Sequence, residues 1–465
     1  MIPLIQNPKS KIQHLLIFLI QNSKSKIQHL FNNKGFRRYA ANTSWLFAEQ
    51  MLRMIAGFFV GVWVARYLGP EKYGIFSYAL AFVAIFQGIA KLGLDGIVVR
   101  DLVKEPEKTQ VYLGTAFWLK LIGGFFSFLL ILIISWFTAD NLQTFLFVNI
   151  IAAGIFFQSF EVIDFYYQAN VQAKYISIRK IAQVILSSII KVYLILINAD
   201  LIWFVLVTLF DAISLAIFSY AIYKKQGLPD FLRYFDVGLA KRLLKESWVM
   251  LFSSFFTLIL LNINSIILKT IHGSYSVGIF YTALTISGLC TFVSVQINSS
   301  ISPSLTSAKV KSDILYKERL LTLFKFLNLL SFLLSGAIFL TSDFIVRILY
   351  GEQYIESSHV LKILVWSNIF LFMGNSSWHW YLNERKQHLS ILRLGIGALI
   401  SLFLGLVLIK YFNVYGAALS TIISYAFAFY LGNFILSGTR SLFMLQTKAI
   451  FSFFNPKKYF EWRVK

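Results

Sequence analysis

Apolar residues form long runs along most of this chain, and polar residues gather between the runs. Twelve such runs follow Trp45, each about long enough to cross the ~30 Å hydrocarbon core of a membrane as a helix. They cover residues 45–65, 73–92, 112–136, 144–163, 176–197, 201–222, 248–270, 277–301, 320–341, 360–381, 391–411 and 414–436. All seven prolines lie outside the interiors of the runs, as helices require. The pattern predicts an all-α polytopic membrane protein with twelve transmembrane helices.

Composition supports a membrane protein, because 57% of the residues are hydrophobic and only 14% are charged. The chain holds 43 Lys and Arg against 21 Asp and Glu. These basic residues are scattered between apolar runs, which is typical of topogenic charge and of attraction to anionic lipids. They form no basic domain for nucleic acid.

The distribution of Lys and Arg predicts the orientation. With the N-terminus inside, the cytoplasmic segments carry 32 basic residues and the opposite loops carry 5. Since positively charged loops stay in the cytoplasm, we expect both termini to be cytoplasmic and the chain to lie in the inner (cytoplasmic) membrane.

The chain divides into five segments by composition. These are an N-terminal extension (1–41), a first six-helix lobe (42–222), a linker (223–247), a second six-helix lobe (248–436) and a basic tail (437–465). The extension contains a tandem repeat of twelve residues, LIQNPKSKIQHL and then LIQNSKSKIQHL. It has no run long enough to span a membrane, and we expect residues 1–34 to be dispensable.

The linker and the tail both mix basic with apolar residues. In the linker, Phe231, Phe235, Leu239 and Leu243 recur every four residues between basic side chains. This spacing predicts an amphipathic helix on the inner leaflet, and residues 451–465 have a similar composition. A solvated surface face is the alternative for both.

The two lobes resemble each other in sequence. Ser44-Trp45 and Ser247-Trp248 open them at an offset of 203. Gly74-Ile75-Phe76 recurs as Gly278-Ile279-Phe280 at an offset of 204. A duplicated six-helix unit keeps its orientation in the membrane and places a substrate site between its copies.

The sequence contains no phosphate-cradling loop, no HExxH motif and no nucleophile elbow. Six scattered histidines and a single cysteine, Cys290, give no pattern for a metal site. The outer loops are short, the longest spanning residues 342–358, which leaves little room for a catalytic domain. We therefore expect no enzyme, no metal and no cofactor, and a function inside the helix bundle.

Polar residues within the apolar runs are the candidates for binding a substrate, because they are costly in a membrane unless they face a cavity or a partner. The candidates are Arg53, Glu49, Lys120, Lys191, Asp211, Asn262, Asn264 and Lys362. For Lys191 and Asp211 the alternative is a structural pair, since they lie about 9 Å and ~15 Å below the outer surface at a rise of 1.5 Å per residue. Four further polar residues near the inner ends of runs are expected to face lipid headgroups: Glu161, Asp164, Gln296 and Asn298.

Arg53 is the strongest of these candidates, since arginine stays charged and its planar guanidinium matches a phosphate with two hydrogen bonds. Glu49 lies one helical turn before it. This carboxylate either neutralises Arg53 or titrates as a group that couples transport to an ion.

The opening of the first lobe resembles the Wzx-type polysaccharide flippases of the multidrug/oligosaccharidyl-lipid/polysaccharide exporter superfamily. The most specific pieces are ARYLGP (65–70), YG (73–74), GL (93–94) and VVRD (98–101), and the two-lobe layout extends the resemblance to about residue 440. The resemblance implies two six-helix bundles in a V around a cationic cavity, similar to multidrug transporters of the superfamily. It implies a polyprenyl-diphosphate-linked oligosaccharide, a repeat unit of a surface polysaccharide such as an O-antigen, as the substrate. It also implies ion coupling, with Arg53 at the position of a cavity arginine of the first span.

Three other functions stay open at this point. A multidrug antiporter of the same superfamily favours an acidic cavity, and a flippase for peptidoglycan precursors often has two additional spans. A membrane glycan ligase or polymerase needs catalytic residues on an outer loop. For the flippase, membrane lipids and a polysaccharide polymerase or export machinery are the expected partners, and nucleic acid is not.

Overall fold

The computed structural model describes residues 34–453, and in this range every regular element is a helix. The helices of the first half are α2 (Lys34–Ala90), α3 (Asp95–Lys104), α4 (Thr109–Thr138), α5 (Leu142–Phe157), α6 (Val162–Ala169), α7 (Ala173–Leu196) and α8 (Leu201–Lys225). Those of the second half are α9 (Val237–His272), α10 (Ser274–Lys311), α11 (Asp313–Leu349), α12 (Glu356–Leu364), α13 (Ser367–Asn383), α14 (Gln387–Ala426), α15 (Gly432–Ile435) and α16 (Arg440–Phe453). A π-helical turn, Phe427–Leu431, joins α14 to α15. The N-terminal repeat and most of the predicted amphipathic tail lie outside the described residues.

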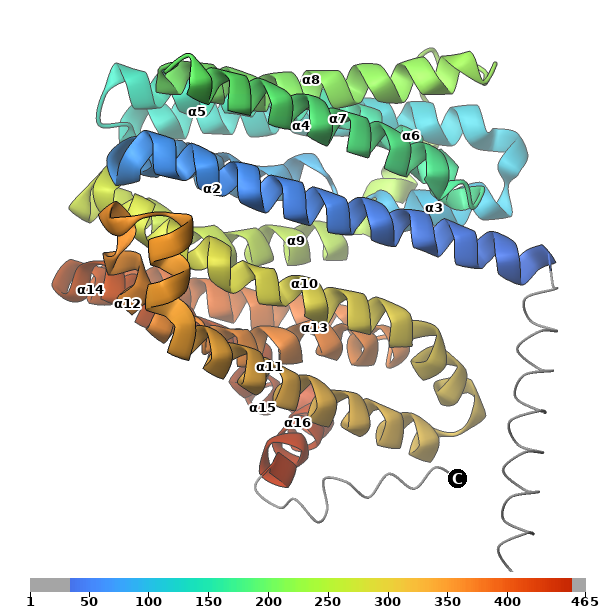
Figure 1. The fold of residues 1–465 in the computed structure, drawn as a ribbon. Helices are drawn as coiled ribbons and strands as arrows, with labels where there is room; N and C mark the ends of the chain where they lie inside the picture. Colours follow the sequence, from blue (N-terminus) through green and yellow to red (C-terminus); the bar gives the residue numbers. More distant parts are fainter. Residues whose placement is uncertain (1–33, 454–465) are drawn as a thin grey trace, which may run out of the picture.

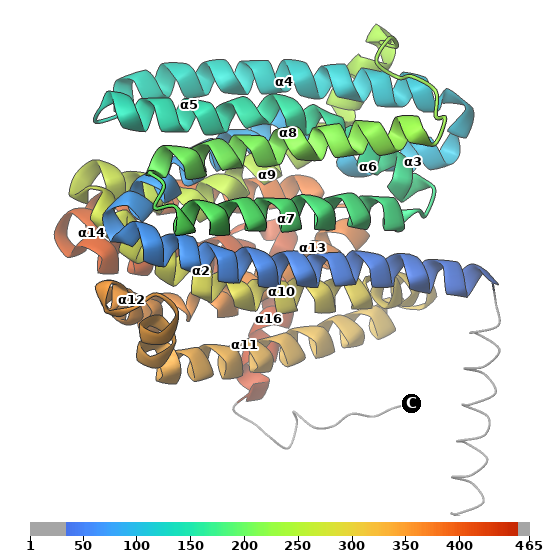
Figure 2. The ribbon, with the colours of Figure 1, turned by 45° about the horizontal axis from the view of Figure 1, so that its top comes forward.

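The helices form two groups that lie side by side. Helices α3 to α8 pack together on one side, helices α10 to α16 on the other, and α2 and α9 run between them (Figures 1 and 2). Helix α2 packs against α7 on one side and against α9 and α10 on the other. It therefore lies at the boundary between the two groups.

Two of the long helices are interrupted by residues in a left-handed conformation. In α2, Gly69 has φ of 71° just before Pro70, and in α14, Asn413 has φ of 48°. Each break separates two apolar runs that the sequence predicts as separate helices. Glycine at 69 adopts this conformation without the steric cost that other residues incur.

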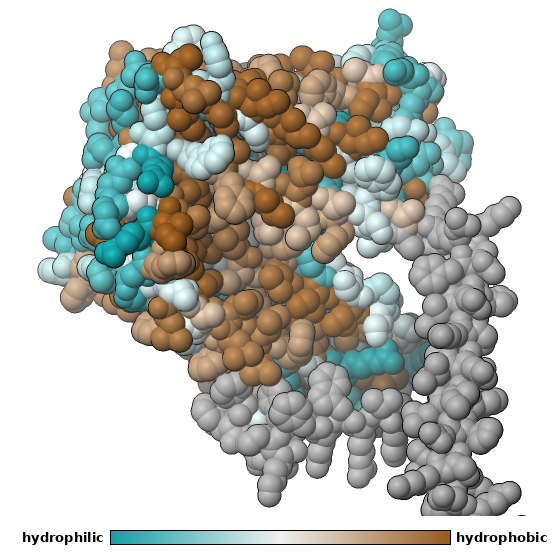
Figure 3. Space-filling view, viewed as in Figure 1, coloured by the Kyte–Doolittle hydropathy of each residue, from teal (hydrophilic) through white to brown (hydrophobic). Residues whose placement is uncertain are grey.

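Eight helical segments within the described residues are long and apolar enough to cross a membrane, or nine if α12 and α13 form one span with a 45° bend. Two of these segments contain the breaks at Gly69 and Asn413. Helix α7 is not among the eight, because it carries Lys174, Arg179, Lys180 and Lys191. Hydrophobic side chains cover the middle of the face shown in Figure 3, and hydrophilic ones gather at its left end. This distribution fits a helical bundle embedded in a membrane.

The two groups share one hydrophobic core at the end where α9 meets α10 and α11 meets α12 (left in Figure 1). We call it the Gly69 end, because Gly69 lies there next to Gln353. Residues of α2, α5 and α8 pack there with residues of α9, α10, α12 and α14. At the opposite end, which holds residues 226–236 and which we call the linker end, the cores are separate. One joins α3, α4 and α6 to α8 and the start of α9, and the other joins α10, α11, α13 and α16.

The contact between the groups at the Gly69 end is very close. A Cβ atom at Gly74 would lie 1.8 Å from the carbonyl oxygen of Ser274, and one at Gly278 would lie 2.1 Å from that of Pro70. Only glycine fits at positions 74 and 278. Nearby, the Tyr354 hydroxyl donates a hydrogen bond to the Ala65 carbonyl at 2.7 Å, and Lys269 pairs with Asp140.

The linker differs from its prediction. Residues 228–231 and 234–236 are not helical, and α9 begins at Val237 and continues into the membrane-spanning part. Phe231 is completely buried against the first group of helices. The backbone amide of Leu232, aided by Lys224, holds the pKa of the Asp230 carboxyl below its ordinary value. The predicted helix starting near Phe231 is therefore wrong, because the helix begins only at Val237 and the buried Phe231 packs the linker against the first group of helices. Phe235 precedes the helix and is exposed, whereas Leu239 and Leu243 lie within α9.

Candidate functional site

A cavity of about 360 Å³ lies between α2, α7, α8 and α10. Both parts of α2, before and after Gly69, contribute to its lining. Its size is within the range of roughly 300–1,000 Å³ that is usual for small-molecule sites. The lining residues are Arg53, Gly57, Val60, Gly61, Val64, Tyr73, Phe76, Leu80, Gln183, Val184, Ser187, Ser188, Lys191, Phe204, Asp211, Tyr281 and Thr285. Three of the predicted site residues, Arg53, Lys191 and Asp211, thus line one cavity.

Arg53 contributes a cation to this cavity from α2. Its Nε atom lies 3.0 Å from a carboxylate oxygen of Glu49, and the spacing of four residues places both on one face of the helix. The Glu49 side chain is only 3% exposed, whereas that of Arg53 is 52% exposed. The pairing with Glu49 therefore leaves about half of the Arg53 side chain open to a ligand.

Lys191 and Asp211 form the predicted pair between α7 and α8. The lysine Nζ lies 3.2 Å from Oδ2 of Asp211, and the Ser187 hydroxyl donates to the same oxygen at 2.9 Å. The other carboxylate oxygen, Oδ1, is buried without a hydrogen-bond partner among the described residues. The cavity thus holds a second cation, which Asp211 pairs and Ser187 helps to position.

Helix α7 turns a polar face toward the cavity. Gln183, Ser187 and Lys191 follow one another at intervals of four residues, so they lie on one side of the helix. The opposite side is apolar and exposed, with Ile185 and Ile189 as examples. A helix with this pattern in a membrane bundle separates lipid from a polar interior.

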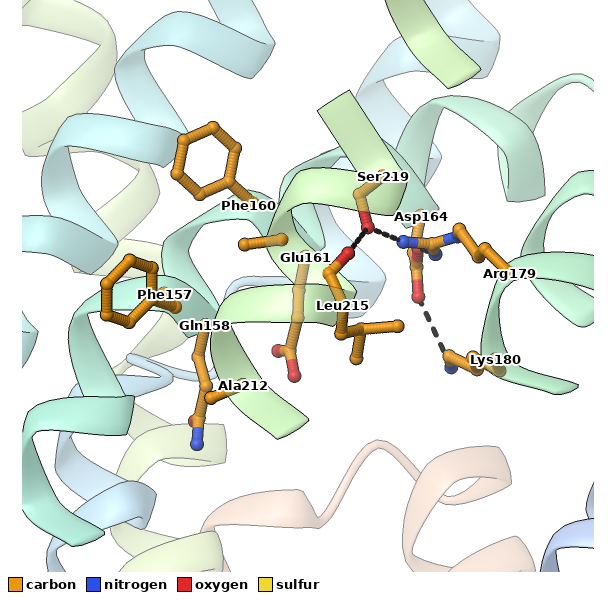
Figure 4. A pocket seen from close by; sticks show the side chains of 11 residues that line it. Phe157, Gln158, Phe160, Glu161, Asp164, Arg179, Lys180, Ala212, Leu215 and Ser219 are labelled. Carbon is orange, nitrogen blue, oxygen red and sulfur yellow. Dashed lines mark hydrogen bonds and ion pairs between the residues drawn. The ribbon is translucent and has the colours of Figure 1, made fainter. Parts of the chain in front are cut away.

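A smaller cavity of about 40 Å³ lies deeper in the first group of helices (Figure 4). Asp164 of α6 pairs there with Arg179 of α7 and, at 3.3 Å, with Lys180. Arg179, whose side chain is 1% exposed, also donates to the Ser219 hydroxyl. The expectation that Asp164 faces lipid headgroups is wrong, because the short helix α6 turns it into the bundle.

Lys120 and Glu161 belong to the same polar interior. Lys120 Nζ lies 2.9 Å from a Glu161 oxygen, and the lysine is buried. Glu161 lines the smaller cavity and does not face headgroups as predicted. Lys120 is occupied by this pair and does not line the main cavity.

The remaining three candidates lie on α9 and α12, and none of them lines the main cavity. Asn262 donates to a carbonyl of its own helix, and Asn264 donates to Thr421 of α14 at 2.9 Å. Lys362 pairs with Asp343 at 2.7 Å between α12 and α11. The contacts of Asn264 and Lys362 join neighbouring helices.

Gln296 and Asn298 are also not where the sequence places them. Gln296 of α10 donates a hydrogen bond to Gln50 of α2, across the boundary between the two groups. Asn298 is buried and donates to the Ser294 carbonyl of its own helix. Neither prediction of a headgroup contact holds, because α10 continues past Pro303 to Lys311 and carries both residues further inside.

Several lining residues escaped the sequence analysis. Tyr73 and Tyr281 close the cavity at the Gly69 end, and Gly57, Gly61 and Gln183 line its walls. For an aromatic residue or a glycine within an apolar run, the sequence does not indicate whether the residue faces lipid, another helix or a cavity. The intervals of four residues in α7 are the one sequence signal that points to Gln183.

No group of three or more His, Cys, Asp and Glu residues that could hold a metal occurs in the described part of the chain.

Comparison with known proteins gives matches over most of the chain. The sequence model of a family described as polysaccharide biosynthesis protein matches residues 39–307. The capsular polysaccharide biosynthesis protein CapF of Staphylococcus aureus is 23% identical over 342 residues, which cover 72% of this chain and 83% of CapF.

Two solved structures illustrate the fold. An inward-facing multidrug resistance MATE family transporter of the MOP superfamily matches with a TM-score of 0.64 at 14% identity, covering 84% of this chain and 96% of the transporter. The lipid II flippase MurJ in an inward closed conformation matches with a TM-score of 0.55 at 16% identity, covering 87% and 92%. At 14% and 16% sequence identity, these matches show a shared fold.

Proposed function

Because the chain belongs to the polysaccharide biosynthesis protein family and has the fold of MOP transporters, we propose that it is a flippase for lipid-linked oligosaccharides. Its substrate is a repeat unit of a surface polysaccharide attached to a polyprenyl diphosphate. The protein moves this unit from the inner to the outer leaflet of the cytoplasmic membrane, coupled to an ion gradient. No bond of the substrate is made or broken.

The cavity with Arg53 on one wall and Lys191 on another is the observation that carries this proposal. A diphosphate with attached sugars does not cross hydrocarbon unaided, because its charges and hydroxyl groups lose their hydration there. Arg53 supplies a permanent cation and a planar donor group for the diphosphate. The lipid tail stays in the bilayer while the polar part occupies the cavity.

The shape of the molecule supports alternating access. The two groups of helices are joined by a shared core at the Gly69 end and have separate cores at the linker end. By the distribution of basic residues, we assign the linker end to the cytoplasm. The structure then represents a state closed toward the outside, and rocking of the two lobes exposes the cavity to the other leaflet.

Twelve membrane crossings are part of this proposal. Helices α2 and α14 cross twice each, on the two sides of Gly69 and Asn413. Helices α12 and α13 together make one crossing, and α7 crosses with its polar face turned to the cavity. The remaining crossings are α4, α5, α8, α9, α10 and α11.

A multidrug antiporter is the second candidate, since transporters of that kind share the fold. The cavity contains Arg53 and Lys191 as well as Asp211, so it is not an acidic cavity of the kind that attracts cationic drugs. Drug resistance conferred by expression, with no effect on surface polysaccharide, would favour this candidate.

Substitution of Arg53 tests the proposed function. Arg53→Lys keeps the charge but loses the planar donor group, so we expect a partial loss of transport, and Arg53→Ala a severe one. The assay compares export of lipid-linked glycan at equal protein abundance in cells that lack the native copy.

A double variant separates binding from a structural role. If Arg53 only neutralises Glu49, then Glu49→Gln with Arg53→Gln restores what the single change loses. Transport by the double variant at the parent level would contradict a role of Arg53 in binding the diphosphate.

A further inference from the structure

Two glycines lie beside Arg53 in the wall that α2 contributes to the cavity. Gly57 and Gly61 follow Arg53 at intervals of four residues, so all three lie on one face of the helix. A Cβ atom at either glycine would meet no heavy atom within 4 Å. Glycine inside a helix is about 1 kcal/mol less favourable than alanine, and no contact in the structure compensates for it here.

Other glycines in the molecule have an evident packing role. At Gly74 and Gly278 a Cβ would collide with backbone of the other lobe. Gly57 and Gly61 differ from them because the space in front of them belongs to the cavity. Their effect is to widen the cavity next to the Arg53 guanidinium.

Opposite this wall, α7 and α8 present hydrogen-bonding groups. Gln183, Ser187, Ser188 and Asp211 line the cavity, and the Ser187 hydroxyl donates to Oδ2 of Asp211. An amide, hydroxyl groups and a carboxylate acceptor form the kind of surface that binds a ligand with several hydroxyl groups.

The end of the cavity is closed by two aromatic rings. Tyr73 of α2 and Tyr281 of α10 meet edge to face with centroids 6.1 Å apart, and Thr285 lies beside them. A pyranose ring has an apolar C–H face and a polar hydroxyl edge. Aromatic rings at one end and hydrogen-bonding groups along one side match these two surfaces.

We propose that Gln183, Ser187, Asp211, Tyr73 and Tyr281 form a subsite for the sugar attached directly to the diphosphate, and that Gly57 and Gly61 provide the width for its ring. The inference rests on the proposed function, since it takes the Arg53 end as the diphosphate site. It adds that the protein selects the first sugar by size, at a position distinct from the diphosphate.

The test uses a graded series at the glycines and two lipids. The variants are Gly57→Ala, Gly61→Ala and Gly61→Leu in the full chain, purified and reconstituted in nanodiscs. One probe is polyprenyl diphosphate without sugar. The other is the lipid-linked glycan that accumulates in cells lacking this protein. Gly288→Ala in α10 is the matched control, because a Cβ there also meets nothing within 4 Å and Gly288 does not line the cavity.

We expect the alanine variants to fold like the parent, since no atom obstructs the new methyl group. Binding of the lipid-linked glycan should weaken with side-chain size, by about ten- to hundredfold for Gly61→Leu. Binding of the sugar-free diphosphate should stay within about twofold of the parent, within the scatter expected when no contact is lost. Gly288→Ala should bind both lipids like the parent.

The remaining outcomes are distinguishable. Equal weakening of both lipids by Gly61→Leu would overturn the sugar subsite and leave the diphosphate site in place. Unchanged binding with lost transport would mean that the glycines serve helix flexibility, which also overturns it. If Arg53→Gln leaves the binding of both lipids unchanged, the proposed function itself fails.

Discussion

Gly74 and Gly278 make reciprocal contacts: each lies against the residue four positions before the other. Gly74 faces the carbonyl of Ser274, and Gly278 faces that of Pro70. Both contacts follow a glycine with positive φ, Gly69 and Gly273, at the same offset of 204 residues. The two lobes thus meet at the Gly69 end through equivalent surfaces, as two repeats related by an approximate two-fold axis do.

We predict that Gly74→Ala and Gly278→Ala open this contact. A methyl group collides with backbone in either variant, at a cost of about 1–3 kcal/mol that favours the state in which the lobes have separated there. A cysteine at Ser77, in a background without Cys290, should then react faster with a water-soluble thiol reagent.

Gly336→Ala is the control for the glycine variants, since its methyl group would meet no atom within 4 Å. An unchanged labelling rate of the cysteine at position 77 in both Gly74→Ala and Gly278→Ala would contradict the prediction. It would show that the contact accepts the methyl group, or that the lobes do not separate at this contact during transport.

The buried pair of Asp164 and Arg179 should matter for stability. Arg179→Leu leaves a buried carboxylate with only Lys180 as partner, and breaking such a pair costs about 3–5 kcal/mol. Thermal unfolding of the purified protein should shift to a markedly lower temperature.

The double variant Asp164→Leu with Arg179→Leu should recover much of that loss, because it leaves no unpaired charge of this pair. The exposed pair of Glu105 and Lys108 provides the comparison, where Glu105→Gln should leave the unfolding temperature unchanged. A double variant as unstable as Arg179→Leu would point to a role beyond mutual neutralisation.

Lys191 and Asp211 should contribute unequally to transport. Lys191→Gln removes a cation from the cavity and leaves a carboxylate that repels a diphosphate, so we expect a loss of at least about tenfold, equivalent to ~1.4 kcal/mol. Asp211→Asn keeps the cation and an acceptor oxygen, and should retain most of the activity.

The pair Lys362 and Asp343 lies outside the cavity and serves as the reference for these variants. Lys362→Gln should transport like the parent in the same export assay. Equal losses for Lys191→Gln and Asp211→Asn would indicate that the pair acts only by holding α7 to α8.

The orientation is open to a direct test. Single cysteines at Lys225 and Ser312, in a background with Cys290 replaced, should resist an impermeant thiol reagent in intact cells, and one at Gln353 should react. The first two lie at the linker end, and Gln353 lies at the Gly69 end. Labelling of Lys225 from outside would reverse the proposed direction of transport.

The apolar runs predicted the helices because the membrane leaves backbone groups no alternative to helical hydrogen bonds. The repeat of Gly74-Ile75-Phe76 also pointed to positions that the structure places at equivalent contacts. The sequence did not predict the 45° bend between α12 and α13, since the apolar run continues across it.

The direction in which a polar side chain faces was harder to predict than its depth. Asp164 and Glu161 were placed near headgroups because they end an apolar run, but each has a partner on another helix, Arg179 of α7 for Asp164 and Lys120 of α4 for Glu161. Arg179 is one of the 32 basic residues assigned to the cytoplasmic side, in the segment 164–180, and it is buried. Arg393 was counted likewise, yet it lies between the rings of Tyr381 and Phe429. Such partners emerge only from tertiary packing.

The polar face of α7 has a consequence for how the protein is made. A Lys or Arg in a membrane helix costs up to about 2.5–3.5 kcal/mol on insertion from the translocon, with the largest cost at the helix centre. Helix α7 carries four of them, Lys174, Arg179, Lys180 and Lys191. The helix is therefore a poor candidate to enter the bilayer alone. Its charges find partners on α6 and α8, where Asp164 meets Arg179 and Asp211 meets Lys191. We expect α7 to be retained beside the nascent chain until α8 has emerged, so that a chain cut off between them fails to integrate its last helix.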